Sequence, residues 1–358
     1  MSKQDFNSLD LIRDLSLAFG PPAFEDDVVA VARQYAPKGA FKIEEDSTRN
    51  FYIYMKEHNP DLPTVLVDAH ADEVGLMVQA VKSNGTIAFV PLGHWVPEVL
   101  AAQKMLIKNN RGEFVTGVMA SKPPHFGASQ GSLEISDLVI DVGATSKQEA
   151  IELFGITPAC PIAPVPFFEM DEKSQIMKGK AFDCRLGCAS VIELMHQIAD
   201  LNLDVNVVGV LSSQEEIGMR GAKVVANKIK PDIVICFEGT PADDTFAMPD
   251  MVQTSLKKGP MLRHIDQGMV THPRFIRFAL DVAAKNGIPT QEAVRAGGAT
   301  NGGVFHLANQ GAPTIVIGHP VRYAHSPNSI SHLPDYTHGL NLSREILKAL
   351  NKDVISSF

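Results

Sequence analysis

Residues 64–70 read TVLVDAH, a short apolar run that ends in polar side chains. Such a run predicts a buried strand whose carboxyl end carries functional groups. Two further strand-like runs precede it, FKIEE at 41–45 and NFYIYM at 50–55. Apolar residues at helical spacing predict helices near 8–19 and over 25–35. The first part of the chain therefore combines helices with at least one buried strand.

Helices and strands alternate again after about Lys180. The helices are predicted near 184–199, 219–229, 271–286, 301–309 and 335–350. The strands are predicted near 205–211, 232–237, 289–294 and 313–318. This pattern is typical of an α/β fold, and we expect a three-layer α/β/α domain around a central mixed sheet.

The segment between these two parts has a different sequence pattern. Short strand-like pieces alternate there with turn signals such as SNG at 83–85 and NNRG at 109–112, and only one helical stretch, 146–153, interrupts them. We expect residues 75–167 to form a small β-rich, barrel-like domain. It would be inserted into a catalytic domain made of residues 1–74 and 168–358.

The composition excludes several classes of protein. The 358 residues carry 32 Lys and Arg against 41 Asp and Glu, a net charge of −9, and we expect no nucleic-acid partner because no basic stripe appears. No run approaches the roughly 18 apolar residues of a membrane span. The opening MSKQDFNSLD lacks the pattern of a secretory signal. Four cysteines predict free thiols in a cytoplasmic protein.

His70 closes the apolar strand at 64–70 and is followed by Asp72 in the sequence AHADEVG. Residues two apart at a strand end point the same way, so the Asp72 carboxylate would hydrogen-bond the imidazole and orient it as a metal ligand. A His and an Asp at this spacing are also common in surface turns. The pair on its own does not decide between the two readings.

A second cluster, Gln214-Glu215-Glu216, follows the apolar run VNVVGVLSS. Neighbouring side chains diverge in extended backbone, so one carboxylate can bind a metal while the other faces a water molecule. The alternative is a helix N-terminus, where acidic residues stabilise the helix dipole.

Three further polar groups lie at comparable places: Asp183 in KAFDCRLG, Glu238 at the end of DIVICF, and His325 in RYAHSP. Taken singly, Asp183 fits a helix N-cap and His325 fits a turn. Strand ends in an α/β sheet gather at one crevice, which would bring these groups to His70 and Glu216. The resulting set of imidazoles and carboxylates is typical of a two-metal hydrolytic site.

Three other patterns carry less weight. GASQG at 127–131 matches a nucleophile elbow, but prolines precede it and a strand-like segment follows where a helix is needed. Cys184 and Cys188 have no second cysteine pair and read as small residues on one helix face. GGATNGG at 297–303 fits no nucleotide-binding fingerprint, and we expect a tight turn that approaches the site.

Five motifs in order, AHADEVG, KAFDCRLG, SSQEEIGMRGA, CFEGTPADD and RYAHSP, give the chain its resemblance to a family. It resembles the tetrahedral (TET-type) metalloaminopeptidases, the glutamyl or deblocking aminopeptidase family, some members of which are labelled endoglucanases or cellulases. The resemblance spans essentially the whole chain. It implies removal of N-terminal residues from peptides with a free N-terminus, and assembly into a hollow homododecamer built from dimers.

The resemblance also implies a role for each metal-ligating residue. His70 and Glu238 match ligands of one divalent ion. Glu216 and His325 match ligands of the other, and Asp183 matches the carboxylate that bridges both. Zinc or cobalt are the usual metals, two ions per subunit.

Glu215 matches the family's general base, and Asp72 matches the acidic residue that orients His70. The chain departs from the family pattern at two positions. Glu238 stands where many members have Asp, and Asn301 replaces the Asp of a glycine-rich motif. The second change removes a negative charge and puts in doubt a role of that position toward the substrate amine.

Two other hydrolase classes remain open from the residues alone. A carboxypeptidase or deacylase on the same metal core needs an arginine for the substrate carboxylate, and Arg263, Arg274, Arg277 and Arg295 lie in the right part of the chain. These arginines would equally favour acidic N-terminal residues. An endoglucanase would need two carboxylates and no metal, which the ligand set argues against. A non-catalytic assembly protein would have no need of Glu215 beside a full ligand set.

The inserted segment contains none of the candidate ligands. We therefore expect it to serve assembly or to restrict access to the site, without a contribution to the chemistry.

Overall fold

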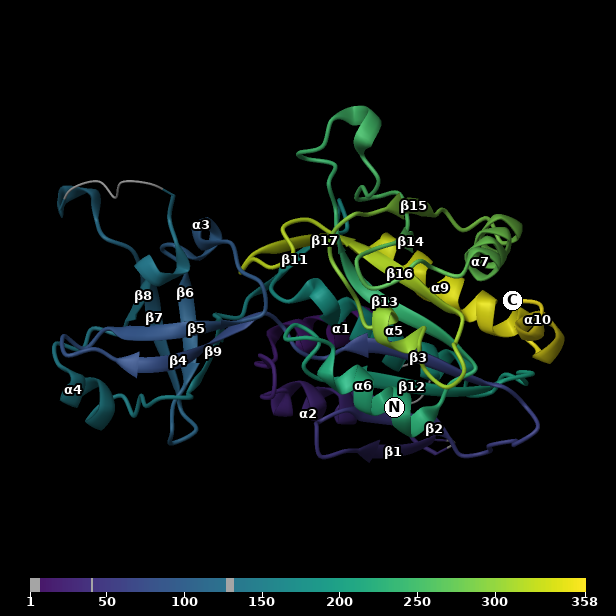
Figure 1. Ribbon diagram of the computed structural model, residues 1–358, viewed down its shortest axis with the longest axis horizontal. Helices are drawn as coiled ribbons and strands as arrows, with labels where there is room; N and C mark the ends of the chain where they lie inside the picture. The colour runs from purple at the N-terminus through teal and green to yellow at the C-terminus, as the bar shows by residue number, and fades with distance from the viewer. Residues whose placement is uncertain (1–6, 40, 127–131) are drawn as a thin grey trace.

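The computed structural model describes residues 7–39, 41–126 and 132–358. The chain forms a larger α/β body and a smaller barrel beside it (Figure 1). The GASQG stretch at 127–131 and the first six residues lie outside the described part. No helix in that part is long and apolar enough to span a membrane.

The body is built on a mixed sheet of eight strands. Their order across the sheet is β1 (Phe41–Glu45), β2 (Phe51–Met55), β12 (Asn206–Ser212), β3 (Thr64–His70), β13 (Ile233–Pro241), β16 (Thr314–Val321), β14 (Met261–Ile265) and β15 (Gln291–Val294). The four central strands β12, β3, β13 and β16 are mutually parallel, and β2 and β14 flank them in antiparallel pairing. Strand β3, which the sequence marked first, thus lies at the centre, and its carboxyl end shares an edge with those of its neighbours.

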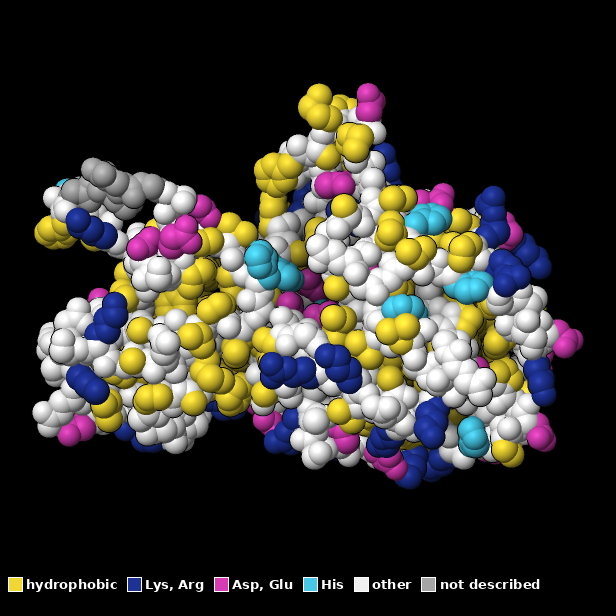
Figure 2. Space-filling view, in the orientation of Figure 1, with side chains coloured by type: hydrophobic (Ala, Val, Ile, Leu, Met, Phe, Trp, Pro, Cys, Tyr) yellow, Lys and Arg dark blue, Asp and Glu magenta, His cyan; other side chains and the backbone are white. Residues whose placement is uncertain are grey.

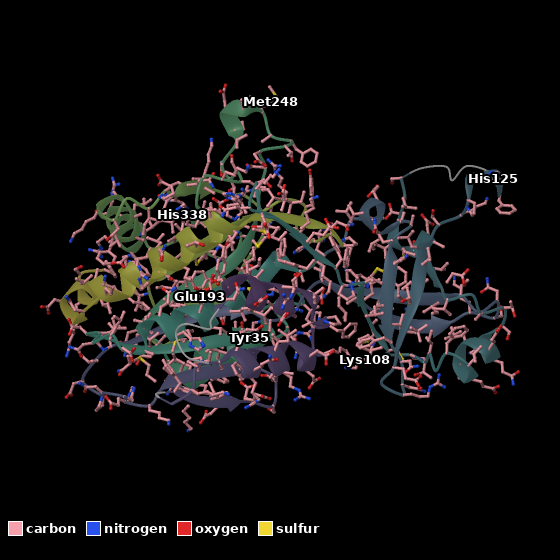
Figure 3. The ribbon with its side chains drawn as sticks, turned by 180° about the vertical axis from the view of Figure 1, so that it is seen from behind. Tyr35, Lys108, His125, Glu193, Met248 and His338 are labelled. Carbon is pink, nitrogen blue, oxygen red and sulfur yellow. The ribbon has the colours of Figure 1, made fainter. Side chains whose placement is uncertain are left out.

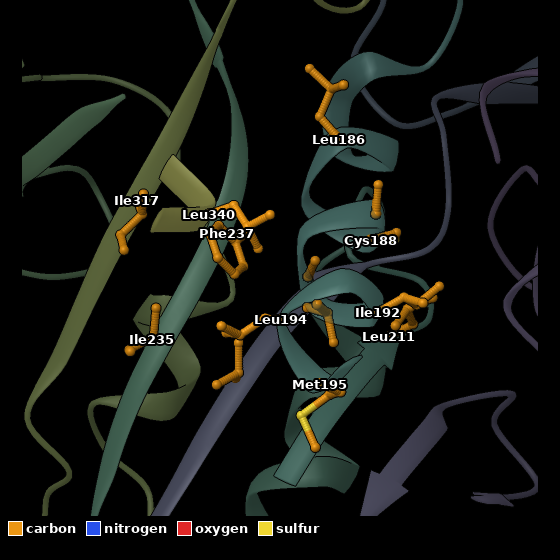
Figure 4. Close-up of a cluster of buried hydrophobic side chains, with 14 of the residues drawn as sticks. Leu186, Cys188, Ile192, Leu194, Met195, Leu211, Ile235, Phe237, Ile317 and Leu340 are labelled. Carbon is orange, nitrogen blue, oxygen red and sulfur yellow. The ribbon is translucent and has the colours of Figure 1, made fainter. Parts of the chain in front are cut away.

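Helices cover both faces of this sheet, because its central strands are apolar on both sides. On one face the core contains Val65 and Val67 of β3, packed with α1 (Ser8–Leu17), α2 (Asp26–Tyr35), α5 (Phe182–Ile198), α7 (Pro273–Lys285) and α9 (Leu333–Ala349). Figure 4 shows α5 side chains against the sheet strands. On the other face Leu66 packs with α6 (Arg220–Ile229) and α8 (Gly302–Phe305). The expected three-layer α/β/α class is confirmed.

The remaining strands form two smaller sheets. A closed barrel contains β4 (Gly75–Val81), β5 (Ile87–Leu92), β8 (Val139–Asp141), β7 (Phe114–Ala120), β6 (Lys104–Lys108) and β9 (Pro161–Pro164). The short helices α3 (Pro97–Leu100) and α4 (Lys147–Glu152) adjoin it. The barrel has a core of its own. A three-stranded sheet of β10 (Phe168–Asp171), β11 (Ile176–Gly179) and β17 (Ser329–His332) belongs to the body, and α10 (Lys352–Ser356) is the last helix in the chain.

Several expected elements differ from the structure. Strand β13 runs on to Pro241, so Glu238 lies inside the strand and does not end it. The helix expected at 301–309 is a single turn, since its first two residues are the poor helix formers Gly302 and Gly303. Strand β14 and helix α3 were not foreseen; the run MLRHI of β14 contains two polar residues and lacks a clear apolar pattern.

Candidate active site

The five expected ligands come together at the carboxyl edge of the central strands. Their ligand atoms form two groups that share Asp183: one contains His70 and Glu238, and the other contains Glu216 and His325. All of them line one cleft of about 890 Å³. Figure 2 shows acidic side chains and a histidine at a hollow near the junction of body and barrel. Strand topology thus gathers residues that are up to 255 positions apart, from 70 to 325.

Asp183 stands between the two histidines. Its Oδ1 lies 3.1 Å from Nε2 of His70, and its Oδ2 lies 3.4 Å from Nε2 of His325. The expected position just before a helix is only nearly right, because Asp183 falls in the first turn of α5 with non-helical φ and ψ of −84° and 106°. Gly239 permits this approach, since a Cβ there would lie 2.4 Å from Asp183 Cα.

The outer carboxylates complete the two groups. Glu238 Oε1 lies 3.2 Å from Nε2 of His70, and Glu216 Oε2 lies 3.4 Å from Nε2 of His325. Each imidazole therefore directs Nε2 at two carboxylate oxygens, one of which belongs to Asp183.

Both histidines are oriented by backbone carbonyl groups. His70 Nδ1 lies 3.0 Å from the carbonyl oxygen of Asp72, and His325 Nδ1 lies 3.0 Å from that of His94. A carbonyl only accepts, so each Nδ1 carries the hydrogen and the lone pair of a neutral ring lies on Nε2. An Nε2 that faces carboxylate oxygens either carries a proton or shares a metal ion with them. This arrangement fits a metal site.

The electrostatics of the cluster lead to the same conclusion. Burial, opposed by His325, raises the pKa of Glu216 to about 8. Its Oε1 is buried and has no hydrogen-bond partner among the described residues. Burial would lower the pKa of His325, but Glu216 and Asp183 raise it to about 10. Buried carboxylates and imidazoles in this number are compensated by divalent cations.

Asp72 lies beside His70, as expected, and has further contacts. Its carboxylate Oδ1 lies 3.5 Å from His70 Nδ1, farther than its own carbonyl oxygen. The carboxylate also accepts hydrogen bonds from the backbone N–H groups of Glu215, at 2.9 Å, and Glu216, at 3.0 Å. Asp72 thus ties the end of β3 to the loop after β12, because the two parallel strands end side by side.

Glu215 lines the cleft beside these ligands, and burial raises its pKa well above the usual range. The preceding residue, Gln214, has φ +54°, in the left-handed region. After this turn, Glu216 Oε2 faces His325, while Glu215 has no ion pair with a histidine among the described residues.

The barrel segment takes part in the site, so the expectation that it contributes nothing is wrong. The loop after β5 supplies the carbonyl of His94, and the same residue lines the cleft. Gly93 in this loop has φ +95°, and a Cβ there would lie 2.8 Å from a methyl group of Val74 and 3.3 Å from Glu216 Cβ. Nothing in the residue types marks this loop, because it acts through its backbone.

The far wall of the cleft is basic and glycine-rich. Of the four candidate arginines, Arg263 and Arg295 line the cleft, while Arg274 and Arg277 lie exposed on α7. Gly297, Gly298 and their neighbours line it too, so the tight turn expected to approach the site does so.

Asn301 lies beneath the cluster, where its amide donates to Asp68 Oδ2 and Ser212 Oγ, both at 2.8 Å. Burial raises the pKa of Asp68 to about 7, and Asn301 and Ser212 oppose the rise. An aspartate at 301 would place a second carboxylate there, so the amide suits this site.

The two cysteines of α5 face the sheet. Cys184 Sγ donates to the Phe237 carbonyl at 3.5 Å, and Cys188 Sγ donates to that of His70 at 3.0 Å. Cys184 is close to the first ligand group, but burial raises the pKa of its thiol well above the usual range. The thiol form is a poor metal ligand.

The chain matches a known protein family. The model of the M42 glutamyl aminopeptidases matches residues 50–342. The chain belongs to the M42 glutamyl aminopeptidase family. It is therefore an aminopeptidase, a hydrolase of peptide bonds, and the expected family resemblance is confirmed.

Two relatives show how far the M42 similarity extends. A glutamyl aminopeptidase of Lactococcus lactis is 31% identical over 97% of this chain and 98% of its own length. A lysyl aminopeptidase of Pyrococcus furiosus is 32% identical over 87% of this chain and 88% of its own. One relative is named for a glutamyl residue and the other for a lysyl residue.

Solved structures of similar aminopeptidases superpose closely on this chain. A TET aminopeptidase from a marine sediment Thaumarchaeota archaeon is 32% identical and superposes with a TM-score of 0.93, over 98% of this chain and 99% of that one. A TET1 structure described as a dodecamer is 25% identical, with a TM-score of 0.85 over 96% of this chain and 100% of that one.

Proposed function

We propose that the enzyme is a two-metal aminopeptidase with Glu215 as general base. His70, Glu238 and Asp183 would hold one divalent ion, zinc or cobalt, and Asp183, Glu216 and His325 would hold the other. When bound, the ions would polarise the scissile carbonyl and acidify the attacking water. The observation that carries the proposal is that both imidazoles direct Nε2 at carboxylate oxygens while Nδ1 is held by a carbonyl.

Glu215 provides the proton transfers. Its carboxylate takes a proton from the attacking water as the carbon–oxygen bond forms, and it returns that proton to the nitrogen that leaves when the carbon–nitrogen bond breaks. The hydrogen bonds that Asp72 accepts from the backbone of Glu215 and Glu216 hold this segment in place.

A substrate with a free N-terminus suits this cleft, because the carboxylates of the cluster complement an ammonium group. Beyond the cluster, Arg263 and Arg295 would receive the side chain of the N-terminal residue. Arg263 Nη1 pairs with Asp266 at 3.0 Å, and Arg295 pairs with Asp243 at 3.4 Å. The Nε atom of each arginine is nevertheless buried with no partner in the described structure. We therefore propose a preference for acidic N-terminal residues.

The rival hydrolases fit less well. A carboxypeptidase or deacylase would use the same arginines for a terminal carboxylate, and family membership favours the aminopeptidase. For a glycosidase, two carboxylates about 5–9.5 Å apart suffice without imidazoles. Two histidines packed against the carboxylates argue against that chemistry.

We also propose that the chain assembles with copies of itself, as a dodecamer. Large apolar side chains are exposed at two places, Phe126 in the barrel segment and Phe246 and Met248 on the loop between β13 and β14. Figure 3 shows Met248 at a projecting tip. Exposed apolar groups at such tips suit burial against another subunit. The four buried free cysteines fit the expected cytoplasmic location.

Substrate panels test the proposed function directly. Aminoacyl anilides with Glu, Asp, Lys or Leu, and their N-acetylated forms, would be assayed before and after removal and return of zinc or cobalt. We expect hydrolysis only of free amines and only with metal restored. Equal hydrolysis of acetylated and free substrates would exclude an aminopeptidase mechanism. Loss of selectivity for Glu would reject only the proposed acidic preference.

A further inference from the structure

The segment that carries the proposed base is held by an unusual series of side chains. Four consecutive backbone N–H groups, from Ser213 to Glu216, each donate to a side-chain oxygen of a distant residue. Asn50 Oδ1 accepts the first at 2.9 Å, and Asp72 accepts the last two. The second, from Gln214, goes to Glu25 Oε1 at 3.1 Å.

Glu25 is out of place for an ordinary acid at a helix start. It stands at the N-cap of α2, where an acidic side chain usually faces solvent and stabilises the helix dipole. Its side chain is instead 0% exposed and makes no capping hydrogen bond to that helix. Its Oε1 accepts from Gln214 N, 189 positions away, and from Ala23 N at 2.9 Å.

Burial of this carboxylate is costly. Its Oε2 has no partner in the described part of the chain. Burial first, and the negative charge of Asp72 second, raise the pKa of Glu25 to about 7. A fold that only needed to fill this space would use an apolar residue, because a buried polar atom without a partner destabilises the protein.

The contact lies at a demanding point of the backbone. Gln214 has φ +54°, a conformation that residues other than glycine adopt at a cost. The turn directs the next two side chains differently, Glu216 toward His325 and Glu215 into the cleft. An acceptor on Gln214 N stabilises that turn, while Asp72 holds the two residues after it.

We propose that Glu25 is a positioning residue for peptide hydrolysis, which fixes the base Glu215 through the N–H group of Gln214. The inference rests on the proposed function, in which Glu215 is the base. Asp72 and Glu25 then act together on consecutive N–H groups of Gln214-Glu215-Glu216. Neither touches the substrate, and Glu25 needs an acceptor oxygen and not a charge.

Substitutions of Glu25 separate positioning from simple structural support. Glu25→Gln keeps an acceptor oxygen, while Glu25→Ala and Glu25→Leu remove it, the second with little loss of volume. We expect kcat to fall by about 10- to 100-fold in the Ala and Leu variants, the size that a small misplacement produces. KM should stay within about threefold and the metal content unchanged. The Gln variant should keep kcat within about threefold of the original.

Controls make the result decisive. Glu193 is a half-buried carboxylate on α5 outside the cleft, and it accepts a hydrogen bond from Tyr336 at 2.8 Å (Figure 3). Glu193→Ala should lower the melting temperature and leave kcat unchanged. In a Glu215→Gln background, Glu25→Ala should cause no further loss, because residues that act through one another are not additive.

Each contrary outcome has a definite meaning. If Glu25→Gln lost as much kcat as Glu25→Ala, or if the Ala and Leu variants kept full kcat, the positioning role would be refuted while Glu215 could still be the base. If Glu215→Gln itself kept full activity, the proposed function would fail, and the inference with it. A folded Gln variant, checked by circular dichroism, keeps the test valid even where the Leu variant does not fold.

Discussion

Glu215 and Glu216 are neighbours in the chain but have different surroundings. Glu216 Oε2 faces His325, while Glu215 has no histidine contact among the described residues and lies at the cleft. We expect Glu215→Gln to keep both metal ions and to lose kcat by at least the roughly 10²–10⁴-fold that general-base loss produces. Glu216→Gln should lose metal occupancy. Metal analysis by mass spectrometry and steady-state kinetics measure the two effects. An emptied Glu215→Gln with a full Glu216→Gln would reverse the roles.

Arg295 gives a second test through a single side chain. Its Nη2 donates to the Pro241 carbonyl at 3.1 Å and to Thr254 at 2.7 Å, which holds the guanidinium at the cleft wall. We expect Arg295→Met to lower kcat/KM for a Glu anilide relative to a Leu anilide by about tenfold or more, because a buried ionic partner is lost. Arg277→Met, on the exposed face of α7, is the matched control and should leave kcat/KM for both anilides unchanged. An unchanged ratio in Arg295→Met would refute the acidic preference.

Among the elements, the loop after β5 links the barrel to the site. Gly93 has φ +95° and lies against Val74 and Glu216, whereas Gly143, also in the barrel segment, has φ +84° and open space around it. Gly93→Ala and Gly143→Ala therefore share the conformational cost, about 1–3 kcal/mol of unfolding free energy. Only the first intrudes on a proposed ligand. We expect Gly93→Ala alone to weaken metal binding, as titration calorimetry would measure. Equal metal affinity in both variants would show that this loop of the barrel segment does not affect metal binding.

Because of this loop, we expect removal of the barrel to affect metal binding as well as assembly. The carbonyl of His94 orients His325, so a chain with residues 75–167 replaced by a linker would lose this acceptor as well as the barrel. We expect such a chain to bind fewer than two ions per subunit. The element that we propose for assembly therefore also supports the chemistry.

For the whole molecule, the proposed assembly predicts both size and selectivity. Sedimentation velocity should find a particle far larger than the 38.8 kDa of one chain. A hollow shell admits short peptides and excludes folded proteins, so an unfolded peptide should be trimmed and a folded protein with the same N-terminus should not. An intact chain that sediments as a monomer would refute the assembly role, whatever the activity.

Much of the fold and of the ligand set follows from local patterns. The apolar run at 64–70 predicted β3, and His70, Asp183 and Glu216 were candidate ligands because they are residue types that can bind metals and lie near strand ends and helix starts. Parallel strands with buried faces bring such ends together. The local sequence therefore predicted the gathering of these side chains, which the structure places in two groups around Asp183.

Tertiary structure alone decided how those groups are held. The acceptors on Nδ1 of His70 and His325 are backbone carbonyls, which every residue carries and no residue type reveals. Contacts such as Glu25 with Gln214 join segments 189 positions apart and depend on which loops pack together. Arg295 lines the cleft and Arg277 does not, which likewise depends on how each element is oriented relative to the cleft. Residue type determines what a side chain can do, while packing determines which partner it meets.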